Sequence, residues 1–396
     1  MRLGFLSLIV ATTQLLGQVW TQLPDFPGIA RDDAASFTIA DIIYVGTGMD
    51  AGFGLTSDWY AFDTGSQTWT TVAPLPASGR QYCATFVIDG IGYLHGGITA
   101  TGTTAELWSY DPTTGTWTTP ISTNAPALYA AAGYAIGGSG YVASGFDADG
   151  QVNELQYGYD PTTGEWTSTW GLVPGSPVHR SAAFVHDGFG YNAGGADISF
   201  AAQQSVWRLD PQMPWWDERA PLPEPRYAGD AVGVPDGGVF IGGASDGATI
   251  HADSWHYQAN ENDWSSLPDF GGGVRRGGVI AFAAPNRIYY GTGSDNVVRY
   301  ADWWMLDLPT GTTGTDEASW GTLSPVPAQD VLNIRIHASS GPCVGTILDA
   351  SGRLLGRAGL QVGQNRMATA HLQNGTYTLV LQTYGGRKGF RFQVTH

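Results

Sequence analysis

The amino-acid sequence predicts an all-β protein that repeats a unit of about fifty residues and then ends in a smaller β domain. Glycine is abundant, with 56 residues in 396, and 15 tryptophans accompany 18 tyrosines. No long segment shows the 3.6-residue apolar spacing of an amphipathic helix. Many turns, many aromatic residues and no helical periodicity together favour short strands joined by tight turns.

Six tryptophans mark the repeat. They are separated by 48 to 50 residues and are Trp20, Trp69, Trp117, Trp166, Trp216 and Trp264. All but the first follow a turn that begins six residues earlier, such as the one opened by Asp111-Pro-Thr-Thr-Gly. Asp and Pro open tight turns, and Gly supplies their positive φ. A glycine pair such as Gly96-Gly97, a spaced variant of it, or Gly145 alone in the third repeat precedes each turn, with an aromatic strand between them. A period near fifty is typical of propeller blades.

This order of glycine pair, aromatic strand, Asp turn and Trp resembles the kelch family over about three quarters of the chain. The resemblance implies a kelch-type β-propeller, the fold of galactose oxidase-like proteins and of sialic acid mutarotases. The last repeat has Thr313 where its tryptophan belongs, whereas a strand at Trp20 opens the array. We therefore expect six blades, with the N-terminal strand as the outer strand of the last blade.

Four segments follow from these patterns. Residues 1–18 read as a signal peptide, with Arg2 before an uncharged run that is too short to span a bilayer. Residues 19–309 are the propeller, and residues 310–321 are a Thr/Gly-rich linker. Residues 322–396 alternate apolar and polar side chains, as at Leu332, Ile334 and Ile336, which predicts a small Ig-like β-sandwich.

The C-terminal domain carries several motifs in a fixed order. Ser324 to Ile334 reads SPVPAQDVLNI, and LDASGRLL, LQNGTYTLVLQT and GRKGFRFQV follow. They resemble the C-terminal sorting domain of bacterial type IX secretion substrates, with Val326 where that family usually has Asn. The resemblance implies export through the periplasm by outer-membrane secretion machinery. An ordinary accessory sandwich is the alternative.

Charge is unevenly distributed along the chain. Residues 19–310 hold 31 Asp and Glu against 10 Arg and no Lys, whereas residues 311–396 hold 4 acids against 7 bases. An acidic propeller repels nucleic acid and anionic membranes, which excludes both as partners. After the signal peptide, no segment of the mature chain is predicted to cross a membrane.

The loops that enter the innermost strands carry recurrent arginines, and the loops between the second and third strands end in acids. The arginines are Arg31, Arg80, Arg180, Arg226 and Arg275, and the acids are Asp58, Glu106, Glu154, Asp253 and Asp302. Ion pairs that tie neighbouring loops are one interpretation. The other is an electropositive ring at the channel mouth that binds a carboxylate or sulfate. Tyr82, Tyr129, Tyr227 and His179 lie beside these arginines and could stack on a sugar or pack in the rim.

Other motifs carry less chemistry. The acids Asp147, Asp149 and Glu154 have the look of a calcium loop but lack the full ligand spacing, so a turn is favoured. Cys83 beside Tyr82 resembles the cross-linked pair of kelch-fold copper oxidases, but no set of copper ligands accompanies it. The sequence predicts no metal and no cofactor.

The predicted function is a secreted or cell-surface binding module for a glycan or a protein, with a small anionic sugar as one candidate ligand. The alternative is a metal-independent sugar-active enzyme that resembles the kelch-fold N-acetylneuraminate mutarotases and epimerases. This alternative rests on the fold alone, and propellers host many unrelated functions.

Overall fold

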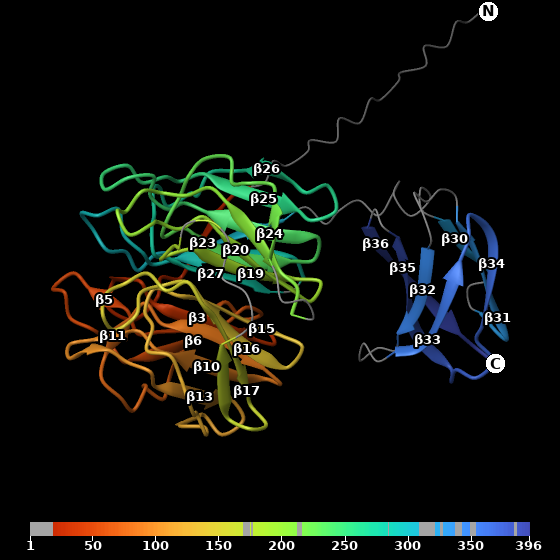
Figure 1. Ribbon diagram of the computed structural model, residues 1–396, viewed down its shortest axis with the longest axis horizontal. Coiled ribbons are helices and arrows are strands. Elements are labelled where there is room, and N and C mark those ends of the chain that lie inside the picture. Colours follow the sequence, from red (N-terminus) through yellow and green to blue (C-terminus); the bar gives the residue numbers. More distant parts are fainter. Residues whose placement is uncertain are drawn as a thin grey trace, which may run out of the picture. The chain divides into compact units, whose positions relative to one another are not determined.

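The computed structural model describes residues 19–168, 175, 177–211, 216–283, 285–308, 321–324, 328–336, 343–348, 354–383 and 386–396. The predicted signal peptide and nearly all of the predicted linker lie outside these residues. The chain divides into two compact units, residues 1–308 and residues 309–396 (Figure 1). The described residues form strands and turns without α-helix, as the sequence predicts.

The first unit contains six four-stranded antiparallel sheets within the described residues, here numbered in chain order. Sheet 1 is β3 (Ala35–Ile39), β4 (Ile42–Gly46), β6 (Trp59–Asp63) and β7 (Thr68–Val72). Sheet 2 is β9 (Ala84–Ile88), β10 (Ile91–His95), β13 (Leu107–Asp111) and β14 (Thr116–Thr118). Sheet 3 is β15 (Ala132–Ile136), β16 (Ser139–Ala143), β17 (Gln156–Asp160) and β18 (Glu165–Ser168).

The remaining sheets repeat this order. Sheet 4 is β19 (Ala182–His186), β20 (Phe189–Ala193), β21 (Val206–Leu209) and β22 (Trp216–Arg219). Sheet 5 is β23 (Asp230–Val234), β24 (Gly237–Ile241), β25 (Ser254–Gln258) and β26 (Asp263–Leu267). Sheet 6 is β27 (Val279–Ala283), β28 (Arg287–Gly291), β29 (Trp303–Asp307) and β1 (Thr21–Leu23). Short ladders join β2 (Arg31–Asp32) to β5 (Met49–Asp50), and β8 (Arg80–Gln81) to β11 (Ile98–Thr99) and β12 (Gly102–Thr103).

The first strand of each sheet lies innermost. Contacts run from β3 to β9, β15, β19, β23 and β27, and from β27 back to β3. These six strands line a cavity of about 520 Å³, here called the channel. Aromatic side chains of one sheet pack on glycines of the next, and a Cβ on Gly92 or Gly140 would overlap the ring of Phe37 or Phe86. The glycines therefore allow neighbouring sheets to pack closely.

The repeated tryptophans join successive sheets at their outer strands. The indole N–H of Trp69 donates to Pro24 O, and that of Trp117 donates to Ala73 O, in each case four residues beyond the preceding tryptophan. Trp20 donates to Pro268 O in the same way, at 3.1 Å. The strand that follows Trp20 pairs with β29, with Thr21 opposite Met305 and Leu23 opposite Trp303. The N-terminal segment therefore supplies the outer strand of sheet 6 and, through Trp20, the repeated contact with sheet 5.

The second unit contains two sheets that share one apolar core. One holds β30 (Gly321–Ser324), β31 (Val331–Ile336) and β34 (Gly363–Ala368). The other holds β33 (Leu354–Leu360), β32 (Cys343–Leu348), β35 (Gly375–Thr383) and β36 (Gly386–Val394). Leu332, Ile334 and Ile336 point into the core with Leu379 and Phe392. Alternation of apolar and polar residues in β31 thus produces a half-buried strand.

Candidate functional site at the channel mouth

Four of the five predicted arginines are buried in ion pairs. The side chains of Arg31, Arg80, Arg226 and Arg275 are 0 to 3 % exposed and pair with Asp58, Glu106, Asp253 and Asp302 at 2.6 to 2.9 Å. Arg31 makes a bidentate pair and also donates to Thr47 O and Thr56 Oγ1. None of the four lines the channel or the cavity at its mouth. These ion pairs connect adjacent loops, which agrees with the first interpretation of the arginines given above.

Backbone hydrogen bonds identify the repeat position that these arginines share. The N–H of Gly48 donates to Arg80 O, that of Gly195 to Arg226 O and that of Gly243 to Arg275 O. The corresponding bonds of Gly97 and Gly145 reach Leu128 and Val178. Arg180 is therefore two residues beyond the shared position, which corrects its placement with the other four arginines.

Arg180 belongs instead to a ring of six residues at one end of the channel, here called the mouth ring. Its members are Asp33, Tyr82, Ala130, Arg180, Ala228 and Gly277. Each N–H donates to the carbonyl of the preceding member, at 2.8 to 3.3 Å, and Asp33 closes the cycle by donating to Gly277 O. All six have φ between +51° and +59°, the left-handed region. The ring surrounds a cavity of about 130 Å³, the mouth cavity.

Arg180 has no carboxylate within ion-pair distance among the described residues. Its Nη1 donates to His179 Nδ1 at 2.8 Å, and its guanidinium lies 4.7 Å from the ring centroid of Tyr82. Burial and then the neighbouring Arg180 lower the pKa of His179 to about 4. The imidazole is therefore neutral, donates from Nε2 to Asp197 O, and holds the guanidinium in place.

Two carboxyl groups line the mouth cavity with Arg180. Burial, followed by the charge of Asp32, raises the pKa of Asp33 to about 7, against the opposing effect of Arg276 and Arg180. Burial also raises the pKa of Asp230 to about 8, although its Oδ2 accepts hydrogen bonds from Tyr290 Oη and Gly278 N at 2.9 Å. Asp230 is half-buried and borders both the channel and the mouth cavity. Near neutral pH, both groups are able to donate or accept a proton.

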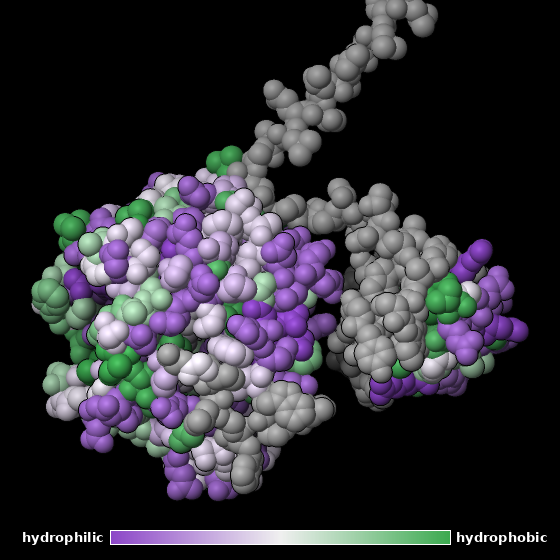
Figure 2. Space-filling model, turned by 45° about the horizontal axis from the view of Figure 1, so that its top comes forward, coloured by the Kyte–Doolittle hydropathy of each residue, from purple (hydrophilic) through white to green (hydrophobic). Residues whose placement is uncertain are grey.

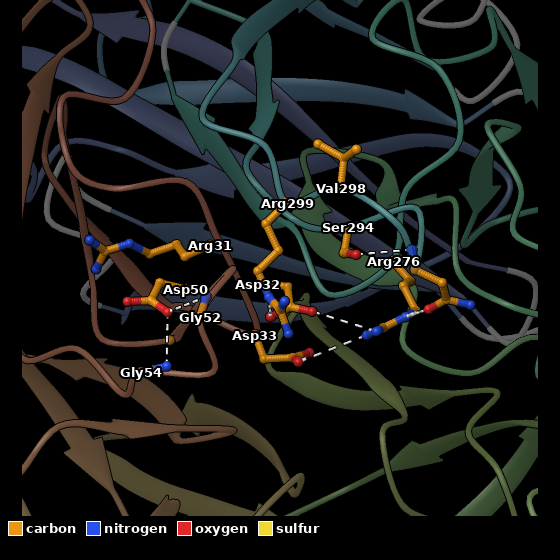
Figure 3. Close-up of polar contacts among 12 residues, drawn as sticks. Arg31, Asp32, Asp33, Asp50, Gly52, Gly54, Arg276, Ser294, Val298 and Arg299 are labelled. Atoms are coloured by element: carbon orange, nitrogen blue, oxygen red, sulfur yellow. Dashed lines mark hydrogen bonds and ion pairs between the residues drawn. The ribbon is translucent and has the colours of Figure 1, made fainter.

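A further charged cluster adjoins the ring. Arg299 Nε donates to Asp32 Oδ1 at 2.6 Å, and Arg276 lies 3.5 Å from Asp32 Oδ2 and 3.9 Å from Asp33 Oδ2. Figure 3 shows Arg276 and Arg299 reaching these carboxylates, whereas Arg31 points away from them.

The predicted aromatic residues take different positions. Tyr82 is a ring member, and burial and then Asp33 raise the pKa of its hydroxyl. Tyr129 stacks on Phe146, with ring centroids 5.1 Å apart, and the hydroxyl of Tyr227 donates to Asp246 O. His179 is buried against Phe146. Of these four, only Tyr82 lines the mouth cavity.

Two minor motifs also resolve into local structure. Asp147 Oδ1 accepts the N–H groups of Asp149 and Gln151 at 2.9 Å, so the acidic loop is a turn. Cys83 lines both cavities, and burial raises the pKa of its thiol to about 12. In the described part of the chain, no group of three His, Cys, Asp or Glu residues is arranged to hold a metal ion.

Sequence reasoning did not identify Asp33, Asp230, Arg276 and Arg299 as site residues. Their signal was available only in part: Asp33 lies two residues, and Arg276 one residue, beyond the recurrent arginine of the same loop. Asp230 begins an inner strand whose counterparts begin with alanine or valine. A single polar residue at that position marks an exception in the channel wall.

The raised pKa of Asp230 predicts a pH-dependent stability. A carboxyl group whose folded pKa exceeds its unfolded value contributes most stability at low pH and loses it as pH rises toward the folded pKa, here about 8. Asp230→Asn should therefore raise the free energy of unfolding at pH 9 by about 2 kcal/mol, a value reduced for contact with channel water, and change it little at pH 5. Urea unfolding at both pH values measures this, with the exposed Asp89→Asn as control. A stabilisation of the same size at both pH values would contradict the ionised state inferred at pH 9.

Comparisons with known proteins bear on the fold. Residues 11–195 match the family model described as the KLHDC2/KLHL20/DRC7 Kelch-repeats domain. No curated protein sequence matches the chain. Among 294 matching chains of solved structure, one titled "Structure of YjhT" has a TM-score of 0.63 and 18 % sequence identity. The match covers 73 % of this chain and 98 % of that one. At this identity the match supports the fold and leaves the ligand open. By its repeats and by its fold, the first unit is a kelch-type β-propeller.

Proposed function

We propose that the propeller is an extracellular binding module whose channel mouth takes a small ligand with a carboxylate, an acidic sugar. Arg180 carries the proposal, since it is a half-buried cation that lines the mouth cavity without a carboxylate partner among the described residues. A guanidinium in a partly desolvated site binds a carboxylate through paired, charge-assisted hydrogen bonds. The four buried arginines have no part in this proposal, because each pairs with an acid and lines neither cavity.

The surroundings of Arg180 favour a small hydroxylated anion. Asp33 Oδ2 and Ser181 Oγ are buried at the mouth cavity and have no hydrogen-bond partner among the described residues. A buried polar atom without a partner costs roughly 1–3 kcal/mol, which a hydroxyl or a water would recover. The excess of acids over the propeller as a whole disfavours a polyanion. A single acidic sugar has hydroxyl groups that can bond to these polar atoms, and it carries only one negative charge.

Replacing Arg180 tests this proposal. We expect glucuronate or N-acetylneuraminate to bind at least tenfold more tightly than glucose or galactose, and Arg180→Ala to remove that preference. Isothermal titration calorimetry at pH 6 measures both. The matched control is Arg208→Gln, which removes an arginine that pairs with Asp217 on outer strands and lines neither cavity. Equal affinity for acidic and neutral sugars, or an unaffected Arg180 variant, would reject the proposal.

A sugar-active enzyme is the second candidate, and Asp33 and Asp230 favour it. Two carboxyl groups with pKa values of about 7 and 8 beside a cation can serve as general acid and base near neutral pH. The anomers of N-acetylneuraminate should then interconvert faster with wild-type protein than with Asp33→Asn, as followed by proton NMR. A wild-type rate equal to that in buffer would eliminate this alternative.

The six sheets of the first unit are the blades of a closed six-bladed propeller in this proposal, with β1 as the outer strand of the last blade. The cyclic contacts of the inner strands and the closed mouth ring support this arrangement. Closure leaves no long exposed strand edge.

Export belongs to the same proposal. The N-terminal segment acts as a signal peptide, and the second unit acts as a sorting domain for delivery to the cell surface. Support comes from the motifs in the sequence and from the division of the chain at residue 308. The described residues contain no helix of the length and apolarity needed to cross a membrane.

Removal of residues 322–396 tests the sorting role. In a native host the truncated protein should accumulate in the periplasm, because the remaining propeller would lack the signal that the outer-membrane machinery reads. Cell fractionation followed by immunoblotting locates the protein, and binding of an acidic sugar by the truncated form controls for folding. Normal surface delivery would reject the sorting role.

A further inference from the structure

Two exposed phenylalanines lie in loops on the mouth side of the propeller. Phe53 lies between β5 and β6, and Phe200 lies between β20 and β21. Their side chains are 74 % and 51 % exposed. On the face shown in Figure 2, apolar residues of the propeller occur as separate small patches among polar ones, rather than as one broad apolar surface. The two rings lie in separate loops of different sheets, which suits local contacts better than a large protein interface.

Both residues have backbone conformations that normally favour glycine. Phe53 and Phe200 have φ of +62°, three residues beyond Asp50 and Asp197. Each aspartate accepts two loop N–H groups at its Oδ1, and its carbonyl accepts the N–H of the phenylalanine. Sheet 3 has the same loop with Gly150, at φ of +72°. A phenylalanine in this region costs about 1–2 kcal/mol more than glycine.

Each ring stacks on an arginine of the site. The Phe200 ring lies 5.5 Å from the guanidinium of Arg180, and the Phe53 ring lies 5.2 Å from that of Arg299, which pairs with Asp32. Sheets 1 and 4, which carry the two loops, are three positions apart in the cycle of six inner strands. The rings therefore flank the mouth from opposite sides. One face of each ring contacts a cation, while much of the ring stays open to solvent.

We infer that Phe53 and Phe200 form stacking subsites for the neutral sugar units that follow an acidic terminal sugar, so that the ligand is the end of an oligosaccharide chain. This inference rests on the proposed binding of an acidic sugar at Arg180. Sugar rings present apolar C–H faces that pack on aromatic rings, while their hydroxyl groups stay in water. The mouth cavity, at about 130 Å³, is too small for a trisaccharide, so additional units must lie over the rim.

The test compares free acidic sugars with the same sugars at the end of neutral chains. N-acetylneuraminate is titrated against sialyllactose, and glucuronate against xylotriose capped with glucuronate. Wild-type protein should bind the longer ligand about tenfold more tightly. Phe200→Gly should abolish this gain and Phe53→Gly should reduce it, while affinity for the free acid is unchanged. Both variants should keep or raise the melting temperature, because glycine relieves the left-handed strain.

Control variants and the contrary results separate this inference from the proposed function. Val297→Ala, in the equivalent loop of sheet 6, removes an aliphatic side chain that is 90 % exposed and should leave both affinities unchanged. Equal affinity of free and chain-linked acids, or no effect of the phenylalanine variants on the longer ligand, overturns the subsites alone. A Phe200 variant that weakens free and linked acids equally also overturns them, since the ring then acts only by supporting Arg180. Failure of every acidic ligand to bind overturns the proposed function as well.

Discussion

Deleting residues 19–24 should lower the free energy of unfolding by at least about 5 kcal/mol, since the deletion removes β1 from sheet 6. Trp20 and Leu23 are buried, and Trp20 packs edge-on against Phe270 with ring centroids 5.1 Å apart. Loss of one buried tryptophan side chain alone costs about 3–5 kcal/mol. The deletion also exposes the edge of β29, because Met305 and Trp303 of that strand lose their pairing with Thr21 and Leu23.

Urea unfolding followed by tryptophan fluorescence measures this effect. If the shortened chain does not fold, Trp20→Ala provides a milder variant with an expected loss of about 3–5 kcal/mol. Val19→Ala is the matched control, because Val19 is exposed and precedes the strand. Unchanged unfolding after the deletion would show that β1 contributes nothing to the closure of the propeller.

Asp302→Ala should destabilise the propeller strongly, with a loss of about 3–5 kcal/mol. Asp302 Oδ2 accepts hydrogen bonds from Arg275 Nη2 at 2.7 Å and from Trp304 Nε1 at 2.8 Å. Arg275 is 1 % exposed, so removal of its partner leaves a buried charge without compensation. Most of the loss comes from this unpaired guanidinium rather than from the attraction between the two groups.

A matched exposed pair serves as the control for this prediction. Asp307 pairs with Arg287 at 2.8 Å but is 67 % exposed, so Asp307→Ala should cost less than about 1 kcal/mol. Calorimetric melting of both variants gives the comparison. Equal losses would mean that burial does not determine the strength of these loop-tying pairs. The double variant Asp302→Ala/Arg275→Met should recover part of the loss by removing the unpaired charge.

The repeated part of the structure could be predicted from the sequence because the same packing requirements recur from sheet to sheet. Tryptophan fills the same inter-sheet position, and the indoles of Trp20, Trp69, Trp117 and Trp264 donate to a carbonyl four residues beyond the preceding tryptophan. Glycine pairs are needed where φ is positive and the backbone contacts the next sheet, as at Gly242 and Gly243. These requirements constrain residue type directly, so they appear as a periodic pattern.

The candidate site could be predicted only in part from the sequence, because the residues of the mouth ring share a backbone conformation but not a type of side chain. Asp33, Ala130 and Arg180 occupy the same place in three sheets and have nothing in common as side chains. The spacing did indicate that Arg180 differs from the others. Arg180 lies 14 residues after its tryptophan, whereas the four buried arginines lie 10 or 11 residues after theirs. The longer connection moves Arg180 out of the structural pairs and into the mouth.

The mouth ring separates the shape of the opening from its chemistry. Six backbone hydrogen bonds fix the ring, while each sheet contributes one residue to it. Five of the six members already adopt left-handed conformations with a Cβ present, so Ala130 and Ala228 could be replaced by larger polar residues without a new backbone cost. Gly277 could not, because a Cβ there would overlap Asp33. Ligand specificity can therefore change through a substitution in one sheet, while the backbone geometry of the channel mouth stays the same.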